Sequence, residues 1–577
     1  MINLRQFLQV LRQKGEVVDI EHEVDPHLEI AEIHRRVIAE GGPALFFRHV
    51  KGSPFPVVTN LFGTRSRVQL AFQNRPDQLI ASLVKFATEE MPPTLPTLWK
   101  KRKLLKNLLH MGMRHVGKVP VKECHLSPPR LDQIPLIKSW PEDGGDFITL
   151  PLVYTEPPQG GAPNLGMYRI QRYDQTTTGL HFQIQKGGGF HYFQAEQENL
   201  PLPVNIFIGG PPALMLSAIT PLPENVSELL LCGLLQGERL AKGDSPYNSY
   251  PLVAECEFAL VGKALPHVRR LEGPFGDHYG YYSLAHEFPV FECEAMYHRK
   301  DAIYPATVVG KPKQEDFFIG DYLQELLSPL FPVVMPSVRD LWSYGETGFH
   351  SLSSAIVKER YERESMVSAF RILGEGQLSL TKFLLLTDQL INLRDFKQVL
   401  RTILERFQPE KDLFIFSPLS MDTLDYTGPS LNKGSRGVML GIGEKIRDLP
   451  CAFQGAPPPS IETIGIYCPG CLLMQGKNVD LTSLLSHQNL SSWPLVILVD
   501  DIQETLKDET TFLWTVFTRF EPAADMHALS SIYKNHIVYK GPILIDARMK
   551  ASYPPIVACD SDTEKLVSKN WNRYFAR

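Results

Sequence analysis

Two carboxylates and one arginine are the residues of this sequence best suited to acid–base chemistry. Glu272 and Asp277 stand five positions apart in Glu-Gly-Pro-Phe-Gly-Asp, a loop that glycine and proline keep from forming a helix. Two carboxyl groups held close together raise one another's pKa, so one of them can keep a proton to donate near neutral pH. Arg169 ends Asn-Leu-Gly-Met-Tyr-Arg, and its guanidinium could hold a carboxylate through two hydrogen bonds. A loop in which Asp277 only caps its own backbone is the structural alternative.

Other polar residues could bind a phosphate or a cation. Lys186 precedes three glycines whose backbone N–H groups could approach a phosphate, although the same residues are typical of a hairpin turn. Glu257 lies in an apolar strand pattern, where an acidic side chain is normally paired or bound to a metal. Cys468 and Cys471 form a single CxxC pair, which we interpret as a turn. The sequence contains no P-loop, HExxH, GxSxG or GxGxxG motif.

The composition is that of a folded globular protein. The 577 residues include 59 Lys and Arg against 64 Asp and Glu, a net charge of −5, and 43% are hydrophobic. This near-neutral balance argues against a dedicated nucleic-acid-binding protein. The eight cysteines suggest no disulfide framework, and the charged N-terminal segment lacks the apolar run of a secretory signal. We therefore expect a cytoplasmic protein.

The pattern of elements predicts three domains and a mixed α/β fold class. Residues 1–120 open with helix and strand patterns, residues 121–325 carry short strand-like runs typical of a β-barrel or sandwich, and residues 326–577 alternate strands and helices. Residues 200–223 are long enough to span a membrane, but a central Gly-Gly-Pro-Pro and flanking prolines indicate a buried strand, a turn and a helix start.

The third domain contains an internal repeat. Residues 382–412 begin with KFLLLTD and end with RFQPEKD, and residues 494–525 begin with PLVILVDD and end with RFEPAAD. Asp388 and Asp501 are 113 positions apart, and so are the arginines of the two endings. Equal offsets predict two β-α units of the same design, which we expect to serve assembly.

A basic stretch closes the first domain. Between Glu90 and Glu123 there are eight Lys and Arg residues and no acidic residue, and leucines 104, 105, 108 and 109 recur at helical spacing. This pattern is typical of a basic amphipathic helix, which can lie on an anionic membrane. A solvated helix that joins two domains is the simpler interpretation.

Taken together, these motifs resemble the UbiD-type family of decarboxylases, the 3-polyprenyl-4-hydroxybenzoate decarboxylase-like enzymes that use prenylated FMN. The matching stretches are NLGMYR, SELLLCGLLQGE, EGPFGDHYGYY, FPVFECEAMYHRKDAIYPATVVGKP and TKFLLLTD…LRDFKQVL. The similarity runs from about residue 1 to about residue 440, with a continuation at GPILIDARMK. The resemblance implies a central split β-barrel like the flavin-reductase FMN-binding folds, flanked by α/β domains, of which the C-terminal one builds a homodimer or homohexamer.

The resemblance also assigns residues to roles. Arg169, Glu272 and Asp277 match the family's catalytic trio, with Asp277 as the proton donor. Asn164 and Glu257 match the residues that hold Mn²⁺ or Mg²⁺ against the cofactor phosphate, and the family also implies a K⁺ ion. The cofactor-binding segments of the family are matched by Met167, Tyr168, Arg169, His181, Phe182, Gln183, Lys186 and Gly187.

Two departures from the family pattern concern the cofactor and its metal. Gln185 stands where the family often has a histidine ligand, and a glutamine carbonyl can bind a hard cation but adds no charge. Arg436 in Gly-Ser-Arg stands where the family has a lysine near the cofactor phosphate. The aspartate strand that normally follows appears near Asp546, so we interpret the second β-α unit as an insertion. Whether Arg436 or a residue near Lys540 contacts the phosphate stays open.

The resemblance implies a function: reversible, non-oxidative decarboxylation of an aromatic or polyprenyl-aromatic acid, in ubiquinone or menaquinone biosynthesis. A separate flavin prenyltransferase would supply the cofactor. The basic helix would suit a lipid-like substrate met at the inner face of the cell membrane. Two alternatives remain: a plain FMN-dependent oxidoreductase, which would use NAD(P)H and release no CO₂, and a non-catalytic flavoprotein of the same fold.

Overall fold

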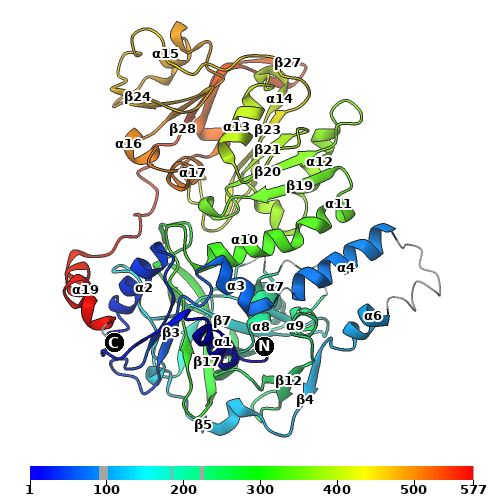
Figure 1. The fold of residues 1–577 in the computed structure, drawn as a ribbon, viewed down its shortest axis with the longest axis vertical. Coiled ribbons are helices and arrows are strands. Elements are labelled where there is room, and N and C mark those ends of the chain that lie inside the picture. The colour runs from blue at the N-terminus through cyan, green and yellow to red at the C-terminus, as the bar shows by residue number, and fades with distance from the viewer. Residues whose placement is uncertain (74, 90–101, 184–185, 221, 223–225, 576–577) are drawn as a thin grey trace. The chain divides into compact units, whose positions relative to one another are not determined.

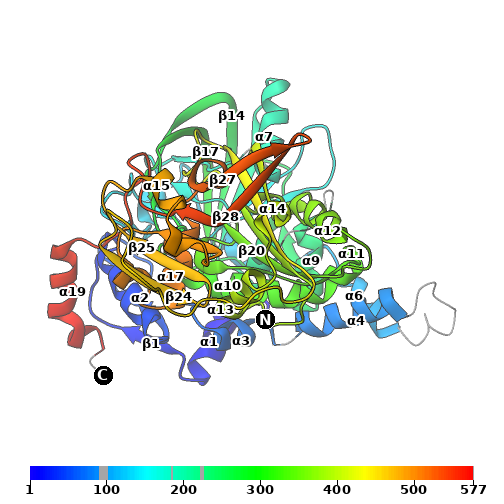
Figure 2. The same ribbon diagram turned by 90° about the horizontal axis from the view of Figure 1, so that it is seen from above.

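A computed structural model describes residues 1–73, 75–89, 102–183, 186–220, 222 and 226–575, which form two compact units (Figures 1 and 2). The first unit consists of Met1–Leu326 and Pro555–Arg577, and the second of Leu327–Pro554. The first two predicted domains thus share one unit. The last segment belongs to that unit as well, although the domain prediction grouped it with the residues before it.

The main sheet of the first unit has seven strands in the order β10-β17-β14-β11-β7-β8, with β5 paired to β17, and every pairing is antiparallel. Their bounds are β5 Cys124–Leu126, β7 Pro151–Thr155, β8 Asn164–Gly166, β10 Thr177–Gly179, β11 Leu202–Ile208, β14 Phe258–Glu272 and β17 His286–His298. Within the described residues this sheet is open, and no closed barrel is found. Strands β8 and β10, three residues each, stand at the two ends of this order. The mixed α/β fold class is confirmed, and the flavin-reductase-like split barrel stays a prediction.

Smaller sheets complete the first unit. Strands β1-β2-β3-β18 form a four-stranded sheet, β13-β12-β4 a three-stranded one, and β6-β9 and β15-β16 are two-stranded. Their bounds are β1 Val17–Ile20, β2 Ala44–Phe47, β3 Val57–Thr59, β4 Met113–His115, β6 Phe147–Ile148, β9 Ile170–Gln171, β12 Leu240–Gly243, β13 Leu252–Val253, β15 Phe275–Gly276, β16 Tyr282–Ser283 and β18 Tyr304–Pro305.

Helices cover these sheets and bring both ends of the chain into one core. The bounds are α1 Leu4–Gln13, α2 Glu29–Ala39, α3 Arg65–Phe72, α4 Arg75–Glu89, α6 Arg102–Leu108, α7 Gly187–Gln197, α8 Pro212–Ile219, α9 Glu228–Gln236, α10 Glu315–Leu327 and α19 Ser561–Tyr574. The C-terminal helix α19 packs on α2, and the hydroxyl of Tyr574 donates to Glu29. One hydrophobic cluster contains residues from Ile20 to Tyr574.

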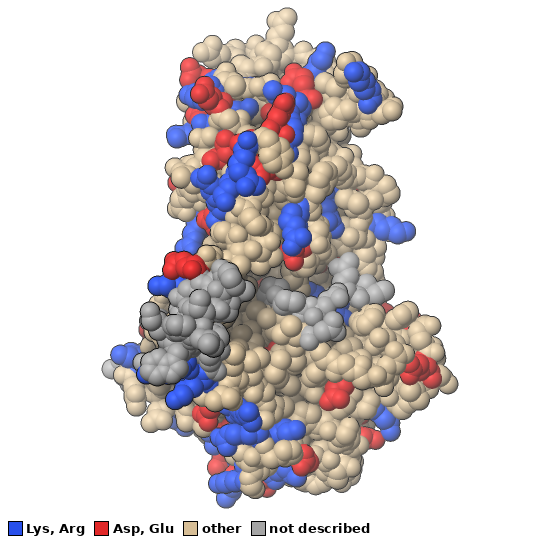
Figure 3. Space-filling view, turned by 90° about the vertical axis from the view of Figure 1, so that its right-hand side faces the viewer, with Lys and Arg blue, Asp and Glu red and all other residues tan. Residues whose placement is uncertain are grey.

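The apolar run at residues 200–223 forms β11, a turn and α8, so the strand–turn–helix prediction is confirmed. No helix among the described residues is long and apolar enough to cross a membrane. Of the predicted basic helix, residues 90–101 lie outside the described residues, and α6 is the part that is seen. Leu108 and Leu109 are exposed there. On the face drawn in Figure 3, basic and acidic side chains of the described residues are interspersed.

The second unit contains two five-stranded sheets with the same topology. The first has the order β19-β20-β21-β23-β22 and the second β24-β25-β26-β28-β27; in both, the two middle pairings are parallel and the two outer ones antiparallel. The strand bounds are β19 Val338–Ser343, β20 Leu352–Val357, β21 Phe383–Thr387, β22 Leu413–Ser420, β23 Lys433–Gly441, β24 Thr463–Cys468, β25 Cys471–Gln475, β26 Leu495–Leu498, β27 Met526–Tyr533 and β28 His536–Asp546. The helix bounds are α11 Phe331–Val334, α12 Glu364–Leu373, α13 Phe396–Leu404, α14 Pro409–Asp412, α15 Leu481–Leu485, α16 Ile502–Thr505, α17 Glu509–Phe517 and α18 Pro522–Asp525.

Candidate functional site

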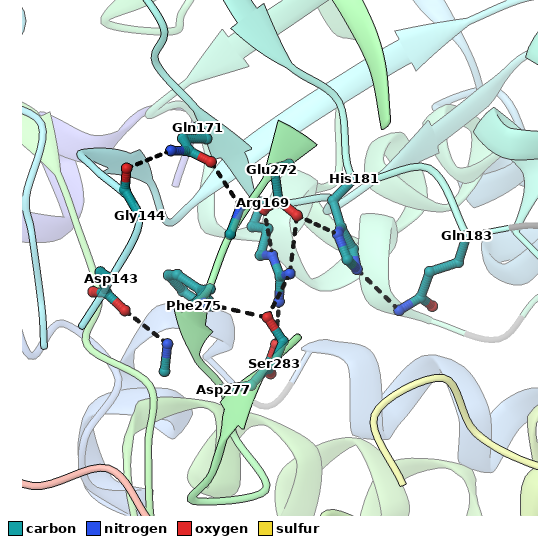
Figure 4. Close-up of polar contacts among 12 residues, drawn as sticks. Asp143, Gly144, Arg169, Gln171, His181, Gln183, Glu272, Phe275, Asp277 and Ser283 are labelled. Carbon is teal, nitrogen blue, oxygen red and sulfur yellow. Dashed lines mark hydrogen bonds and ion pairs between the residues drawn. The ribbon is translucent and has the colours of Figure 1, made fainter. Parts of the chain in front are cut away.

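The structure brings Arg169, Glu272 and Asp277 into one hydrogen-bonded cluster of the first unit (Figure 4). Arg169 lies between β8 and β9; its Nε and Nη2 donate to the two carboxylate oxygens of Glu272 at 2.8 and 3.1 Å, in the fork geometry that suits a guanidinium. Its Nη1 donates to Asp277 at 2.5 Å and its Nη2 to Ser283 Oγ at 2.9 Å. The Glu272 side chain is fully buried, and that of Arg169 is 8% exposed.

Arg169 and two histidines together keep both acids ionised. Burial alone would raise the pKa of Glu272, but the Arg169 charge and the His181 hydrogen bond outweigh it and lower that pKa to about 2. Burial likewise opposes ionisation of Asp277, and His278 and Arg169 together hold its pKa below the usual range. The expected mutual raising of the two pKa values is therefore corrected for this arrangement, because a cation lies between the two carboxylates.

A buried histidine also contacts Glu272, at the same oxygen that accepts from Arg169 Nη2. His181 Nδ1 lies 3.1 Å from Glu272 Oε2, and Gln183 Nε2 lies 3.4 Å from His181 Nε2 (Figure 4). Burial and the Arg169 charge lower the pKa of His181, so the ring is neutral. Since the ionised Glu272 can only accept, the ring proton is assigned to Nδ1, and Nε2 accepts from Gln183. The structure thus places His181 beside the acid–base trio, whereas the resemblance put it in a cofactor-binding segment.

A second histidine connects Asp277 with the surface. Both the backbone N–H and the Nδ1 of His278 lie 2.7 Å from Asp277 Oδ1. The His278 side chain is 28% exposed and that of Asp277 10%. His278 was not assigned a role from the sequence, although it stands in the EGPFGDHYGYY stretch that carries the resemblance.

The loop that carries Asp277 is held by a neighbouring turn. The buried carboxylate of Asp143 accepts from the N–H of Gly276 at 2.7 Å and from two N–H groups of its own turn. Burial raises the pKa of Asp143 to about 6. Gln171 accepts from the N–H of Gly273 and donates to the carbonyl of Gly144, each at 2.8 Å (Figure 4). Sequence reasoning missed both anchors, whose only signal is the Asp-Gly-Gly turn at residues 143–145.

The predicted cofactor segment forms a narrow cradle at the start of α7. The hydroxyl of Tyr168 accepts from the N–H of Gly188 and from Asn164 Nδ2, both at 3.2 Å, and its ring meets Phe182 edge-on at 5.3 Å. A Cβ on Gly187 would lie 2.2 Å from Asn164 Oδ1, so only glycine fits there. Lys186 is the residue at the N-cap position of this helix, and Met167 precedes Tyr168. Backbone N–H groups at a helix start beside a lysine suit a phosphate group.

The second predicted metal ligand, Glu257, is used elsewhere. Its fully buried carboxylate accepts from Arg5 Nε and Nη2 at 3.0 and 2.9 Å and from the N–H of Ile303 at 3.1 Å. In the main sheet, Asn164 of β8 pairs with Thr155 of β7. Glu257 comes directly before Phe258 of β14, which pairs with Ile208 of β11, and Ile208 pairs in turn with Pro151 of β7.

That register separates the two predicted ligands. Thr155 and Pro151 lie four residues apart on β7, roughly 13 Å at the rise of a β-strand. Side-chain oxygens that share one ion must lie within a few ångströms of one another. The predicted pairing of Asn164 with Glu257 around one metal ion is therefore corrected.

Glu228 is the carboxylate that the structure places beside Asn164. It is the first residue of α9, and its Oε2 accepts from the N–H of Leu165 at 2.9 Å. Burial raises the pKa of Glu228, as expected for a carboxylate that would gain from a nearby cation. A signal for it existed: Glu228 stands in SELLLCGLLQGE, one of the stretches that carry the resemblance.

Other predicted residues fall outside this cluster. Gln185 lies outside the described residues. Among the residues described, no group of three or more His, Cys, Asp and Glu side chains could hold a metal ion. In the second unit, Arg436 donates to Ser420 and to the carbonyl of Leu373. Cys468 and Cys471 face one another across a β-hairpin as free thiols.

Family models match three successive parts of the chain. They are the N-terminal domain of 3-octaprenyl-4-hydroxybenzoate carboxy-lyase at residues 8–87, its Rift-related domain at residues 114–312 and its C-terminal domain at residues 317–441. Together they cover more than half of the 577 residues.

A curated relative and two solved structures are similar over most of their own length. A Chlamydia pneumoniae protein, named as a subunit of 4-hydroxybenzoate decarboxylase, is 55% identical over 99% of this chain and 98% of that protein. Vanillic acid decarboxylase of Sedimentibacter hydroxybenzoicus is 26% identical with a TM-score of 0.66, over 79% of this chain and 96% of its own. HmfF of Pelotomaculum thermopropionicum, a UbiD-class enzyme in complex with prFMN, has the same fold with a TM-score of 0.62 at 23% identity, over 79% and 97%.

Proposed function

This chain belongs to the UbiD family of carboxy-lyases, and from that premise we propose that it decarboxylates an aromatic or polyprenyl-aromatic acid with prenylated FMN. The family members that it resembles are decarboxylases. The observation that carries the proposal is the buried arginine held between two carboxylates, one of which reaches the surface through a histidine.

The residues at the start of α7 fit a phosphorylated cofactor. Gly187 leaves no room for a side chain beside Asn164, and the N–H groups of the first helical turn lie next to Lys186. Tyr168 and Phe182 add aromatic surface at the same place. When bound there, prenylated FMN would supply the electron sink that the departure of CO₂ requires.

Arg169 orients the substrate carboxylate. In the structure its Nη1 is bonded to Asp277, so a substrate carboxylate that binds Nη1 displaces the Asp277 carboxylate from it. Glu272 and Ser283 keep the guanidinium in place during this exchange, because they occupy Nε and Nη2. His181 holds Glu272 in turn.

Asp277 protonates the carbon that loses CO₂. When the Asp277 carboxylate has moved off Arg169 it is still buried, but the guanidinium no longer stabilises its charge. The pKa of Asp277 therefore rises, and the side chain can hold a proton. Asp277 then needs a new proton after each turnover. His278, which is bonded to Asp277 and partly exposed, delivers that proton from solvent.

A divalent cation would be held by Asn164 and Glu228, next to the phosphate cradle. An amide oxygen and a carboxylate are hard ligands suited to Mn²⁺ or Mg²⁺. Glu257 has no part in this site, since Arg5 uses both of its oxygens. The cation would bring positive charge to the cofactor phosphate.

The biological setting that we propose follows the relatives. Vanillic acid decarboxylase and the Chlamydia pneumoniae relative, a 4-hydroxybenzoate decarboxylase by its name, act on aromatic acids as those names say. We further propose that the protein acts in quinone biosynthesis and forms a homo-oligomer, and that a flavin prenyltransferase supplies its cofactor. Its proposed location is the cytoplasm, with contact between the basic α6 region and the membrane.

The experiment that tests the proposal is co-expression with a flavin prenyltransferase, followed by absorbance and mass spectrometry of the bound flavin and assays of CO₂ release. Bound prenylated FMN together with CO₂ from a panel of hydroxybenzoic acids supports it. Bound plain FMN together with NAD(P)H oxidation and no release of CO₂ would instead identify the protein as an FMN-dependent oxidoreductase. Purified protein without any flavin would favour a non-catalytic role.

A further inference from the structure

The two sheets of the second unit are related like the two copies of a symmetric dimer. We propose that the second sheet, β24–β28 with α17 and α18, takes within one chain the place that the sheet of a second copy would take in a twofold dimer. The second sheet thereby covers the surface of β19–β23 that could otherwise pack against a second copy of the chain.

The repeat is exact in its element bounds over three successive elements. Helices α13 and α17, helices α14 and α18, and strands β22 and β27 begin and end 113 residues apart. The capping residues repeat as well: Asp395 accepts from the N–H of Gln398, and Asp508 from that of Thr511. One backbone design was therefore used twice, not two unrelated units.

The contacts between the two halves are reciprocal. Helix α14 of the first half packs on β28 of the second, and α18 of the second packs on β23 of the first. Pro409 and Pro522 are the first residues of the equivalent helices α14 and α18. A Cβ placed on Gly541 of β28 would lie 3.5 Å from Pro409, and a Cβ placed on Gly437 of β23 would lie 3.5 Å from Pro522. Helix α13 also meets β24, while α17 meets the turn that follows β19. Reciprocity of this kind defines an isologous, twofold interface.

The interface is a hydrophobic core, not a loose contact. One cluster of buried side chains includes residues of both sheets and of α13 and α17. Phe383 meets Phe517 and Phe520 at ring distances of 6.3 and 5.5 Å, and Phe396 meets Phe512 at 6.2 Å. Without the second half, the first would expose this aromatic surface, which a soluble protein has to cover.

The comparisons indicate that the second half is an addition. The model of the family's C-terminal domain ends at residue 441, the last residue of β23. The vanillic acid decarboxylase structure is matched over 96% of its length but covers only 79% of this chain. The Chlamydia pneumoniae relative is matched over 98% of its length and 99% of this chain, so it shares the added segment. A homo-oligomer of this chain therefore has to use surfaces other than this core, which changes the role expected for the C-terminal domain.

A cross-link across the interface tests this in the full chain. The N–H of Ala523 donates to Ser435 Oγ at 2.8 Å, so the double variant Ser435→Cys/Ala523→Cys brings two thiols together. We expect oxidation to join them within one chain, without doubling of the mass, at every protein concentration. Each single variant is the control for the native cysteines. A product of two chains, or no reaction between the two thiols, would overturn the proposal.

Hydrogen exchange of the unmodified protein gives an independent measurement. We expect the protection of peptides from β21, α13 and α17 to stay constant from nanomolar to tens of micromolar protein, whatever oligomer forms. Protection in these peptides that grows with protein concentration would show that this core is completed by a second copy, and would refute the proposal.

Discussion

Replacing Arg169 by methionine is the perturbation whose effect the structure predicts most fully. The side chain keeps a similar length but loses its charge, and the buried Glu272 loses its cation. In the wild type, the pKa of Glu272 is about 2 instead of 4.5. At about 1.36 kcal/mol per pKa unit this difference corresponds to about 3 kcal/mol, at the lower end of the roughly 3 to 5 kcal/mol that breaking a buried ion pair costs.

The stability that Arg169→Met loses depends on pH, and the direction of this dependence can be predicted. In the wild type the depressed pKa contributes stability that is present above 4.5 and is lost as the pH falls toward 2, so it is constant between about pH 5 and 7.5. In Arg169→Met, burial raises the pKa of Glu272, and the folded variant takes up a proton that the unfolded chain lacks. Its stability then falls as the pH rises, by up to about 1.4 kcal/mol per pH unit. The stability of the variant relative to the wild type also falls with rising pH if the extra proton binds His181. In the wild type the Arg169 charge lowers the pKa of His181, and the substitution removes that charge.

The assay is urea unfolding of both proteins between about pH 5 and 7.5, followed by hydrogen exchange of β14 and β17 peptides so that the first unit is measured by itself. The matched control is Arg172→Met. Its partner Asp146 keeps its contact with His27 and is more exposed than Glu272, 12% against 0%, so its carboxylate should stay ionised and this variant should follow the wild-type pH profile. A stability difference between Arg169→Met and the wild type that does not change with pH, or that grows toward low pH, would contradict this prediction.

Three further predictions concern the site. Asp277→Asn should retain bound flavin but lose decarboxylation by about 10² to 10⁴-fold, measured as CO₂ release, and full activity would exclude Asp277 as the proton donor. Glu228→Gln should weaken Mn²⁺ binding by more than about 10-fold in a titration of the purified protein, whereas Glu257→Gln should leave it unchanged and lower the melting temperature; the reverse result would restore Glu257 as the ligand. His278→Phe should slow turnover, by less than Asp277→Asn does, and added imidazole should restore part of the rate; a rate unaffected by the substitution would remove His278 from the proton path.

Much of the second unit could be predicted from the sequence because the signals are local. A capping aspartate, the helix that follows it and the turn at Arg-Phe-Gln-Pro or Arg-Phe-Glu-Pro depend on hydrogen bonds between residues three or four apart. The constant offset of 113 residues therefore appears again in the bounds of α13 and α17. How the two halves face one another could not be predicted, because side-chain packing between distant segments decides it.

The first unit shows the opposite case. The short strand runs were visible in the sequence, but whether their sheet closes depends on which edges pair, and edge pairing leaves no local pattern. The split barrel that the resemblance implied therefore stays a prediction. The strand–turn–helix at residues 200–223 was predictable because its prolines and glycines act on their own backbone.

The family, the candidate residues Arg169, Glu272 and Asp277, and the internal repeat could be predicted from the sequence, because each stands in a motif of characteristic residue types. Which carboxylate lies beside Asn164 depends on the fold. Glu228 reaches it because α9 begins beside β8, while Glu257 is held by Arg5 from a helix 252 residues earlier in the chain. The fold also decided the charge of Glu272 and Asp277, because a pKa depends on burial and on the charges nearby, and folding brought Arg169 between the two acids.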